Sequence, residues 1–229
     1  MSDQKIETLT LDNISKIYGE RRVLFNLSLQ FKKGEIVAVT GANGAGKTTL
    51  LNILATVIKP SSGNLLLNNN NADAKMIRSV CGYLSHEFFL YSDLTCEQNL
   101  KFFSRMYGVK SNKKLLQLSK DFLLAEFFSD LKVSELSRGQ LQKSSFARVF
   151  AGEPSLVFLD EPLTALDDEA SKMVKTVIQN NAKHGGIVIF ASHKRDFIET
   201  TATREVILEN GKIVSDIQNK SLSYFKNNE

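Results

Sequence analysis

The stretch "GANGAGKT" at residues 41–48 is the clearest indication of the fold of this chain. It fits the pattern G-x-x-x-x-G-K-[ST]. It stands between the β-branched run "GEIVAVTG", which predicts a buried strand, and the helical pattern of "NGAGKTTLLNILATVI". Glycines in such a loop let successive backbone N–H groups turn inward around phosphate oxygens, and the N-terminus of the following helix adds partial positive charge. The sequence therefore predicts a nucleotide-triphosphate site between this strand and this helix.

The side chains of the loop have separate expected roles. Lys47 is expected to reach the β- and γ-phosphates, and the Thr48 hydroxyl to coordinate Mg²⁺. A match to this pattern arises by chance in roughly one chain of this length in a hundred, so an ordinary Gly-rich turn is a weak alternative. The residues that we expect to contact the nucleotide here are Gly41, Ala42, Asn43, Gly44, Ala45, Gly46, Lys47, Thr48 and Thr49.

A second stretch, "SLVFLDEP" at residues 155–162, supplies two acidic groups. Its four apolar residues, Leu156 to Leu159, predict a buried strand that delivers Asp160 and Glu161 to its exposed end. Asp160 is expected to hold Mg²⁺ through its carboxylate, by way of water, and Glu161 to polarise the attacking water as general base. An acidic pair after a strand is common by itself, and its place downstream of the phosphate-binding loop is what makes it specific.

Strand patterns surround these two stretches. The run "LFNLSLQF" at residues 24–31 alternates apolar with polar positions, as a half-buried strand does, and its apolar positions are Phe25, Leu27, Leu29 and Phe31. Strands are also predicted at "SLVFLD" and "GGIVIFAS", and a final hairpin at "REVILENGKIVSDI", with Asn210-Gly211 at its turn. The helix after the loop has apolar residues at positions 50, 51, 54, 57 and 58. We expect an α/β P-loop NTPase fold with a RecA-like core, whose mixed sheet is joined by an antiparallel N-terminal β-subdomain.

The segment from about 87 to 152 has amphipathic helical patterns and almost no strand signal. Thr95 and Gln98 make a capping box, Gly108 is a plausible helix stop, and Leu100, Phe103 and Tyr107 share one face. The run "KKLLQLSKDFLLAEFF" at residues 113–128 continues in the same style. We expect a single domain over residues 1–229, with a core at 1–86 and 153–229 and an inserted helical subdomain at about 87–152.

Composition limits the partners. The 229 residues carry a formal net charge of only +4, and the basic residues are scattered, which weakly favours nucleotides or a membrane surface and gives little support to nucleic-acid binding. No run approaches the ~18–20 apolar residues that a bilayer-spanning helix needs. Cys81 and Cys96 make neither a C-x-x-C pair nor a disulfide framework, so we expect reduced, structural thiols.

The stretch "LSRGQ" at residues 136–140 gains meaning beside the two stretches above. Together they resemble the ATP-binding cassette family of transporter ATPases along essentially the whole chain. Residues 137–140 resemble that family's signature motif, "LTALD" (163–167) resembles its dimer loop, and "ASHK" carries its switch histidine, His193. Tyr18 falls where the family stacks an aromatic ring on adenine, although a core tyrosine is the alternative.

The resemblance implies an enzyme that hydrolyses ATP with Mg²⁺, with Lys47, Glu161 and His193 as its catalytic residues. Its signature residues, Ser137, Gly139 and Gln140, would contact nucleotide at the start of a helix predicted at about 139–151. Two antiparallel subunits would sandwich two ATPs, close on binding and reopen after hydrolysis. Integral membrane transporter subunits would be the partners, and the location would be peripheral, on the cytoplasmic side of the inner cell membrane. Arg138 replaces the family's commoner glycine, and we expect tuning rather than loss.

A histidine, His86, ends the strand predicted at "CGYLSH", where the family usually has a glutamine that touches Mg²⁺ and the attacking water. Neutral imidazole can donate or accept a hydrogen bond much as an amide does. We favour a hinge residue that senses the γ-phosphate, although the substitution puts contact with Mg²⁺ in doubt. The alternatives are a solvent-facing histidine and a transition-metal ligand, for which no second ligand lies at a useful sequence spacing.

Four large residues follow this histidine: Phe88, Phe89, Leu90 and Tyr91. They fall where the family forms a groove that grips a short helix of the membrane subunit, and such side chains suit a docking pocket better than a solvated surface. The alternative is that they pack inside the helical subdomain.

The order "GYLSH…LYSDLTCEQNLKFF" with "DEPLTALD" most resembles the haem-exporter ATPase group of cytochrome c maturation, whose members also place histidine where others have glutamine. Exporters of lipids, drugs or polysaccharides share the architecture and are the main alternative. A soluble cassette ATPase of translation or DNA repair fits less well, because the chain has one cassette and segment 87–136 lacks sustained heptads. A non-hydrolysing regulatory subunit is disfavoured by the complete set Lys47, Thr48, Asp160, Glu161 and His193.

Overall fold

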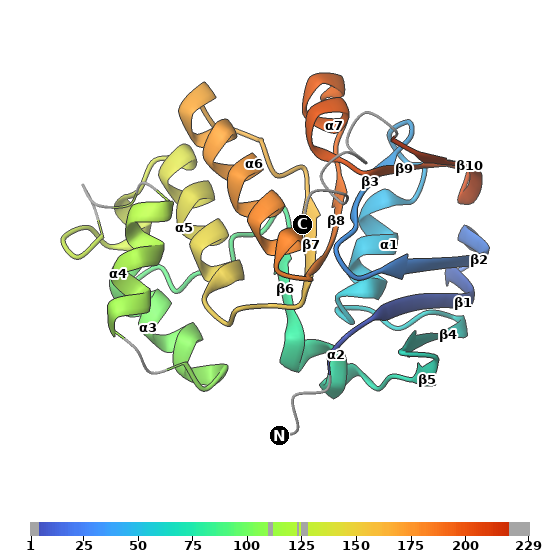
Figure 1. Ribbon diagram of the computed structural model, residues 1–229, viewed down its shortest axis with the longest axis horizontal. Coiled ribbons are helices and arrows are strands. Elements are labelled where there is room, and N and C mark those ends of the chain that lie inside the picture. Colours follow the sequence, from blue (N-terminus) through green and yellow to red (C-terminus); the bar gives the residue numbers. More distant parts are fainter. Residues whose placement is uncertain (1–4, 110–111, 123, 125–127, 220–229) are drawn as a thin grey trace.

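The computed structural model describes residues 5–109, 112–122, 124 and 128–219. Within them the chain forms two β-sheets, with one helix held between the sheets and a group of helices on the outer face of the larger sheet (Figure 1). Residues 123 and 125–127 of the predicted helical run at 113–128 lie outside the described residues. No helix of the described chain has the length and apolar character required to cross a bilayer.

The larger sheet has the strand order β10-β9-β3-β8-β7-β6. Its strands are β3 (Ile36–Thr40), β6 (Cys81–Leu84), β7 (Leu156–Asp160), β8 (Ile187–Ala191), β9 (Arg204–Glu209) and β10 (Lys212–Gln218). Only the β9–β10 pair is antiparallel. Because the other strands run parallel, the carboxyl ends of β3, β6, β7 and β8 meet at one edge of the sheet, and the functional site lies there.

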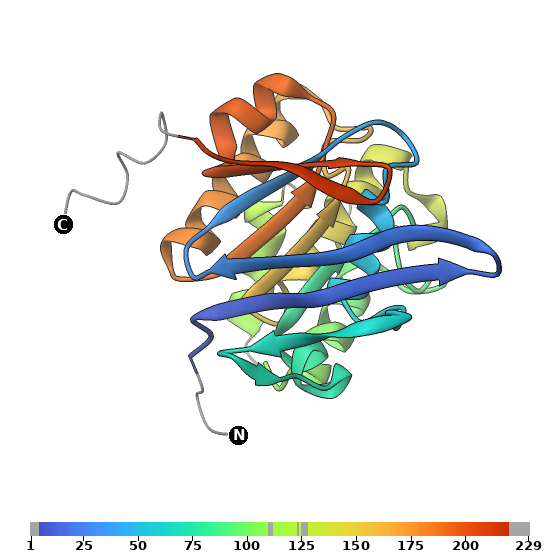
Figure 2. The same cartoon turned by 90° about the vertical axis from the view of Figure 1, so that its right-hand side faces the viewer.

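The smaller sheet is antiparallel, with the order β2-β1-β4-β5. Its strands are β1 (Thr8–Tyr18), β2 (Arg21–Lys32), β4 (Ser62–Leu67) and β5 (Asn70–Asn71). In Figure 2 the β1–β2 hairpin lies in front of the larger sheet and extends beyond it. The antiparallel N-terminal β-subdomain expected from the sequence is confirmed.

The expected alternation in β2 breaks at one position. Asn26 has a φ of 48°, and the pairing with β1 steps from Ile14↔Leu27 to Lys16↔Leu24. This β-bulge places one extra residue in β2, because a step of two positions along β1 matches a step of three along β2. The alternation of buried and exposed positions in β2 shifts by one residue there. Leu24 is therefore buried, and Phe25, which we expected on the buried face, is half-buried instead.

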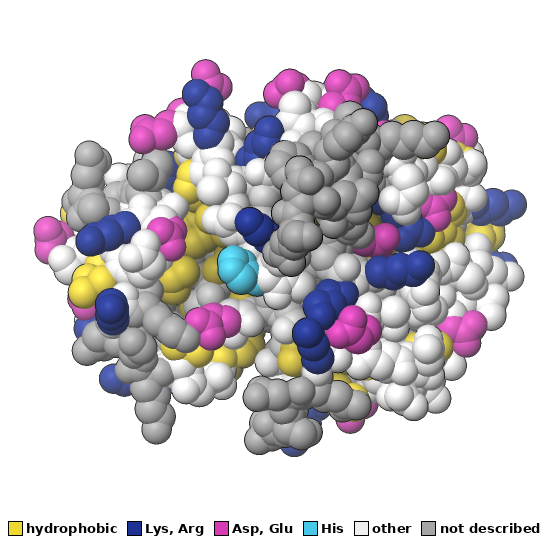
Figure 3. All heavy atoms as spheres, in the orientation of Figure 1, with side chains coloured by type: hydrophobic (Ala, Val, Ile, Leu, Met, Phe, Trp, Pro, Cys, Tyr) yellow, Lys and Arg dark blue, Asp and Glu magenta, His cyan; other side chains and the backbone are white. Residues whose placement is uncertain are grey.

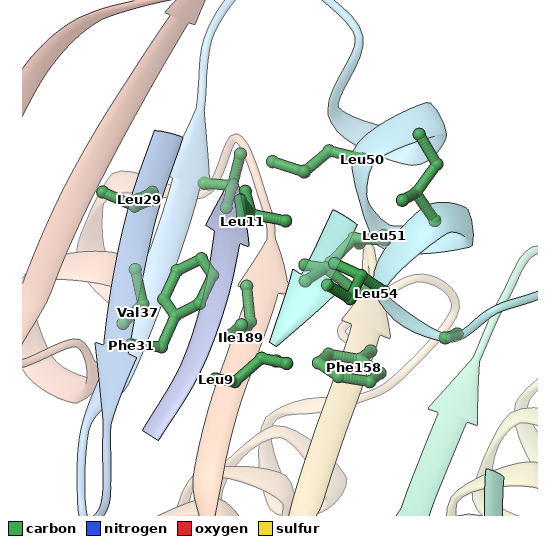
Figure 4. Close-up of a cluster of buried hydrophobic side chains, with 14 of the residues drawn as sticks. Leu9, Leu11, Leu29, Phe31, Val37, Leu50, Leu51, Leu54, Phe158 and Ile189 are labelled. Carbon is green, nitrogen blue, oxygen red and sulfur yellow. The ribbon is translucent and has the colours of Figure 1, made fainter. Parts of the chain in front are cut away.

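Helix α1 (Lys47–Leu54) packs between the two sheets. Figure 4 shows leucines of α1 pointing toward side chains of both sheets, among them Leu9, Phe31 and Phe158. The helix stops earlier than its apolar pattern suggests. Thr56 turns to a φ of 56°, the backbone N–H groups of residues 57 and 58 both donate to the Asn52 carbonyl, and the Val57 side chain is 55% exposed. Because this turn ends the helix, residues 57–58 do not continue the helical face as expected, although Ile58 still packs against the core around α1.

Most other helices cover the opposite face of the larger sheet. They are α3 (Cys96–Met106), α4 (Asn112–Asp121), α5 (Arg138–Phe150), α6 (Asp168–Lys183) and α7 (Arg195–Thr201), while α2 (Ala74–Val80) leads into β6 and packs Ile77 in the core around α1. In β3, Val37 and Val39 face α1, whereas Ile36 and Ala38 face the second core. The alternation of a strand buried on both faces thus divides the interior into two cores.

The local signals of the helical segment are confirmed. Thr95 and Gln98 form the predicted capping box at the start of α3, and Gly108 closes the helix with a φ of 79°. Leu100 is buried, whereas Tyr107 is 38% exposed and its hydroxyl lies 3.3 Å from the Cys81 carbonyl oxygen, to which it donates. Cys81 and Cys96 are free and buried, as predicted, and burial raises the pKa of Cys81 to about 11.

The final hairpin also has the predicted turn. Asn210 and Gly211 have φ angles of 48° and 74°, as a two-residue turn with two left-handed positions requires. The backbone N–H of Gly211 donates to the Ala45 carbonyl oxygen at 3.1 Å. The hairpin therefore supports the phosphate-binding loop directly.

Candidate functional site

The loop between β3 and α1 is tightly enclosed. Gly41 and Gly46 have φ angles of 138° and 107°. A Cβ at Gly41 would lie 2.1 Å from the Leu208 carbonyl oxygen, and one at Gly46 would lie 2.6 Å from Cδ2 of Leu24. Both conformation and space therefore demand glycine at position 41, and the positive φ favours glycine at position 46.

Lys47 begins α1 and folds back over the loop. Its Nζ donates to the carbonyl oxygens of Gly41 at 2.8 Å and Ala42 at 3.1 Å. The first turn of α1 has no acidic residue, so the partial positive charge of the helix N-terminus is not offset there. This end of α1 is therefore electropositive and suited to a triphosphate.

The carboxylate of Asp160 is buried at the end of β7, with a side chain only 2% exposed. Burial raises the pKa of this carboxyl, while a hydrogen bond from Thr48 opposes the rise. Its Oδ2 accepts no hydrogen bond from any described residue, which is costly for a buried acceptor. A carboxylate and a hydroxyl oxygen placed in this way fit Mg²⁺, whose shell is completed by water and phosphate oxygens.

The metal would depend on the nucleotide for part of its shell. Among the described residues, no group of three or more His, Cys, Asp or Glu side chains is placed to hold a metal ion. Mg²⁺ is usually bound through one or two carboxylates together with substrate phosphates.

Glu161 leaves β7 in a strained conformation. Its φ is 47°, which is uncommon for a residue other than glycine, and its N–H donates to the Ala191 carbonyl oxygen at 3.0 Å. Its side chain is 20% exposed and lies 3.0 Å from Nδ1 of His193, which is itself largely exposed. The two residues come from neighbouring parallel strands, β7 and β8. The structure thus brings together two of the predicted catalytic residues.

His86 lies at the same edge, just past β6. Its Nε2 is 3.3 Å from Oδ2 of Asp160, and its side chain is 65% exposed. The His86 side chain is therefore largely exposed to solvent, but one of its ring nitrogens faces the buried carboxylate of Asp160. The neighbour of this nitrogen comes from the end of β7, 74 positions further along the chain.

The signature segment begins α5. Ser137 is the N-cap, its hydroxyl accepts from the Gln140 N–H at 3.3 Å, and its own N–H donates to the Gln140 side chain at 2.9 Å. A Cβ at Gly139 would lie 3.0 Å from the Ala165 carbonyl oxygen, so this glycine abuts the 163–167 loop. The helix begins at Arg138, close to the predicted start.

This segment is separated from the phosphate-binding loop of the same chain. Helix α5 packs on one face of the larger sheet and α1 on the other (Figure 1). Among the described residues, no hydrogen bond or ion pair joins residues 136–140 to residues 41–49. The structure therefore does not bring these two sets of predicted nucleotide contacts together within one chain.

Tyr18 ends β1 at the tip of the hairpin. Its side chain is 47% exposed, so it is not a core tyrosine. The Lys16 ammonium lies 4.9 Å from its ring centroid. The ring is thus available for stacking, as the adenine role requires.

Of the four large residues after His86, some are exposed, as a docking surface requires, and others pack inside the protein. Phe89 and Tyr91 are about half exposed, whereas Phe88 is half-buried and Leu90 packs against the core beneath α5 and α6. One of the two exposed rings contacts a neighbouring helix: Tyr91 packs edge-on against Phe102 of α3, with ring centroids 5.0 Å apart. An exposed aromatic surface therefore extends from this loop onto α3.

Sequence reasoning missed two residues beside the site. Glu205 of β9 accepts hydrogen bonds from the Thr40 hydroxyl at 2.8 Å and from Arg195 at 2.7 Å, and so connects the end of β3 to the helix after His193. Arg148 of α5 donates to the Tyr83 carbonyl oxygen at 2.7 Å, beneath Phe89. Neither lies in a motif, and no sequence signal marks them.

A second concave region lies away from these residues. A cavity of about 670 Å³ is at the opposite edge of the larger sheet, beside the residues that precede β7 and β8. Its walls include Phe122, Phe150 and Met173. None of the predicted site residues lines it, so size alone does not identify the nucleotide site.

Surface charge on the face drawn in Figure 3 is mixed. Among the described residues drawn there, Lys and Arg side chains are dispersed among Asp and Glu. The pattern agrees with the small net charge of +4.

Comparison with known proteins identifies the relatives of this fold. A family model described as "ABC transporter" matches residues 24–164. The glutamine transport ATP-binding protein GlnQ of Escherichia coli (strain K12) is 32% identical over 89% of this chain and 88% of that protein. The cytochrome c biogenesis ATP-binding export protein CcmA of Nitrosomonas europaea is 32% identical over 89% of this chain and 96% of that protein. The macrolide export ATP-binding/permease protein MacB of Campylobacter jejuni is 34% identical over 90% of this chain, which spans only 33% of that protein.

Solved structures agree with the observed topology. The ATP-binding subunit of an ABC transporter superposes with a TM-score of 0.85 at 25% identity and covers 95% of this chain and 92% of that one. The dimeric, post-hydrolysis state of the ATP-binding cassette MJ0796, bound to ADP and Pi, gives a TM-score of 0.80 at 26% identity, over 93% of this chain and 99% of that one. The predicted fold class is confirmed: the chain has a mixed-sheet P-loop NTPase core with helices packed beside it.

Proposed function

The chain belongs to the ABC transporter family as a nucleotide-binding ATPase subunit, and we propose that the transporter it powers exports haem for cytochrome c maturation. One observation supports ATP hydrolysis by this chain. Four side chains converge at one edge of the larger sheet: Lys47, Asp160, Glu161 and His193.

In the proposed hydrolysis, Lys47 and the N-terminus of α1 hold the β- and γ-phosphates. Thr48 and, by way of water, the otherwise unsatisfied Oδ2 of Asp160 would hold Mg²⁺, which would neutralise phosphate charge. Glu161 accepts a proton from the attacking water, and His193 orients that water and contacts the γ-phosphate. The 3.0 Å contact between Glu161 and His193 supports a shared task for this pair.

Nucleotide is proposed to be held between two subunits. Ser137, Gly139 and Gln140 would contact the ATP bound to the phosphate loop of a second copy. Support comes from the position of α5, which packs on the face of the sheet opposite to α1. The start of α5 offers an uncovered helix N-terminus with Ser137 as its cap, which suits a γ-phosphate. Loss of that phosphate would remove the contact and let the subunits part.

The membrane partner is proposed to dock on α3 and the loop before it. Phe89, Tyr91 and Phe102 present exposed rings there. Beside them is a groove of about 460 Å³, lined by Gln98, Lys101, Phe102, Arg105 and Met106. An apolar floor with a basic rim suits a short amphipathic helix that carries acidic residues. Docking there would place the chain on the cytoplasmic side of the membrane.

The choice of haem rests on two observations. His86 stands where the haem-exporter group has histidine and most of the family has glutamine. The CcmA relative also has nearly the same extent as this chain, because the match covers 96% of it. Relatives named for glutamine transport and macrolide export match at similar identity, so the substrate is the finer part of the proposal.

Complementation tests the two parts separately. A host strain without this chain should lose covalently bound haem in its c-type cytochromes, which is measured by haem staining after electrophoresis. Wild type should restore the stain, Glu161→Gln should not, and Glu209→Gln, at the exposed hairpin turn, should serve as the matched control. Normal haem staining in the deletion strain would overturn haem export, while ATP turnover by the purified protein would still support the ATPase.

A further inference from the structure

The carboxylate of Glu205 joins two segments of the proposed site that are far apart in the sequence. Its Oε1 accepts a hydrogen bond from the Thr40 hydroxyl at 2.8 Å and another from Nη1 of Arg195 at 2.7 Å. Thr40 is the last residue of β3, directly before the phosphate-binding loop, and Arg195 is the first residue of α7, two positions after His193. One oxygen atom of β9 therefore connects the base of the loop to the start of the helix that follows the proposed phosphate sensor.

Arg195 has two acidic neighbours, and the contact with Glu205 is the stronger one. The Glu205 side chain is only 16% exposed, so water competes weakly for its oxygen atoms, and the contact joins opposite charges. This hydrogen bond is the main reason why the pKa of Arg195 is raised. Glu199, one turn further along α7, lies at 3.2 and 3.4 Å, and its side chain is 63% exposed, as in a weak surface ion pair.

The segment between β8 and α7 has weaker contacts of its own. Within the described chain, Lys194 is the N-cap of α7 but makes no side-chain cap hydrogen bond, and its N–H donates to the Ser192 hydroxyl at 3.2 Å. Nζ of Lys194 reaches the Leu163 carbonyl oxygen only at 3.4 Å, beyond the usual range for such a bond. The His193 side chain is 76% exposed, so packing does not fix it.

Core packing holds the body of α7 rather than its first residue. Phe197 and Ile198 are buried in the core on the outer face of the larger sheet and fix the position of the helix. Arg195 precedes them, at the end nearest to His193, and its side chain is 60% exposed. The charged contact with Glu205 is therefore the interaction that orients this end of the helix.

Resting on the proposed function, we propose that Glu205 is a positioning residue for ATP hydrolysis. Through Arg195 it holds the segment that carries His193, and through Thr40 it ties that segment to the phosphate-binding loop. A displacement of about 1 Å in a reacting site can slow the chemical step about 100-fold. The rate of hydrolysis should therefore depend on Glu205, whereas ATP binding, which rests on Lys47 and α1, should not.

Steady-state kinetics of the purified chain test this role. Glu205→Gln keeps the size of the side chain and removes its charge, so kcat should fall about tenfold while KM for ATP changes little. Glu199→Gln is the matched control, because it removes the weaker partner of the same arginine and should leave both constants unchanged. The stoichiometry of ATPγS binding counts the competent sites in each sample and corrects for unfolded protein. Equal kcat values for the two variants would overturn the proposal.

A double-mutant cycle tests whether the two contacts of Glu205 act as one unit. Thr40→Val keeps nearly the same shape and removes the hydrogen-bond donor, so kcat should fall severalfold. Added to Glu205→Ala, it should cause no further loss, because the acceptor is already gone. Losses that multiply in the double variant would show that the two residues act independently and would overturn the proposal.

Nuclear magnetic resonance of the histidine rings gives a readout that a loss of stability alone would not move. The chain has three histidines, so replacing each in turn assigns every ring signal. The His193 signal should shift in Glu205→Gln and stay in place in Glu199→Gln. The signal of His184, which lies at the opposite edge of the larger sheet, should shift in neither variant. An unmoved His193 signal in Glu205→Gln would overturn the proposal.

The same measurements separate this inference from the function on which it rests. If wild type hydrolyses ATP and Glu205→Gln matches Glu199→Gln, the ATPase stands and the positioning role of Glu205 fails. If wild type neither binds nor hydrolyses ATP, the proposed function fails as well.

Discussion

Nδ1 of His193 lies 3.0 Å from the carboxylate of Glu161, although 32 positions separate the two residues in the chain. The contact exists because β7 and β8 are parallel neighbours in which Asp160 pairs with Ala191, so the residues that follow each strand emerge side by side. Glu161 begins its turn in a left-handed conformation held by its hydrogen bond to the Ala191 carbonyl oxygen. The sheet therefore fixes the relative positions of the proposed base and the proposed phosphate sensor.

Replacement of Glu161 by glutamine should stop hydrolysis without preventing binding. The amide cannot accept a proton from water, so the ATP turnover number should fall about 100-fold or more. ATP should still bind through Lys47 and α1, and a dimer should accumulate that light scattering after size-exclusion chromatography can detect. Turnover at the wild-type rate would contradict the assignment of Glu161 as general base.

Two glycines of the phosphate loop should differ in their tolerance of alanine. A Cβ at Gly44 meets nothing within 4 Å, so Gly44→Ala should cost only the left-handed strain of about 1–2 kcal/mol. Gly41→Ala places its Cβ against the Leu208 carbonyl oxygen and should cost about 1–3 kcal/mol more. Urea denaturation of the nucleotide-free protein measures both free energies of unfolding. Equal losses for the two variants would show that the loop relaxes around the added methyl group.

The two substitutions at His86 should separate hydrolysis from coupling. With Mg²⁺ as the cation, His86→Gln keeps a hydrogen-bonding group beside Asp160 and should hydrolyse ATP much as wild type does. His86→Ala removes that group and should break the link between hydrolysis and the membrane partner. ATP turnover and transport, measured together in reconstituted vesicles, check this. Similar transport by His86→Ala and wild type would defeat the hinge role.

The exposed aromatic surface should affect partner binding more than chemistry. Phe89→Ala and Tyr91→Ala should each reduce co-purification of the membrane subunits severalfold and leave ATP turnover of the isolated chain nearly unchanged, because neither side chain contacts the phosphate loop. Ile217→Ala, a similarly exposed apolar residue on β10, is the matched control and should have no effect. An equal effect of all three substitutions would mean that the docking surface is elsewhere.

Acid should remove one contribution to stability. Arg204 donates from Nε and Nη2 to the Asp216 carboxylate at 2.6 and 2.7 Å, and this holds the pKa of Asp216 below its usual value. A carboxyl with a lowered folded-state pKa stabilises the protein above its unfolded-state pKa, and the contribution disappears as pH falls through the folded value. The difference in unfolding free energy between wild type and Asp216→Asn should therefore be constant from pH 7 to about 5 and shrink below about pH 4. Urea denaturation across that range measures it, and a constant difference down to pH 3 would contradict the ion pair.

Features that depend on a few neighbouring residues could be predicted from the chain before its structure was known. The phosphate loop, the capping box at Thr95, the Asn210-Gly211 turn and the strand before Asp160 were all predictable, because backbone conformation and local hydrogen bonds decide them within one turn or one strand. The family resemblance added the signature at Ser137, whose role as a helix cap the structure displays.

The way in which those features meet depends on long-range packing. The β-bulge at Asn26 depends on how β2 pairs with β1, and the early end of α1 at Leu54 depends on how the helix packs. The periodicity of apolar residues in the sequence predicts neither. The contact of His86 with Asp160 requires β6 to lie beside β7, and the separation of Ser137 from Lys47 requires α5 and α1 to cover opposite faces of the sheet. Strand order and the choice of face depend on contacts between residues far apart in the chain, and local patterns specify only which residues are available to make them.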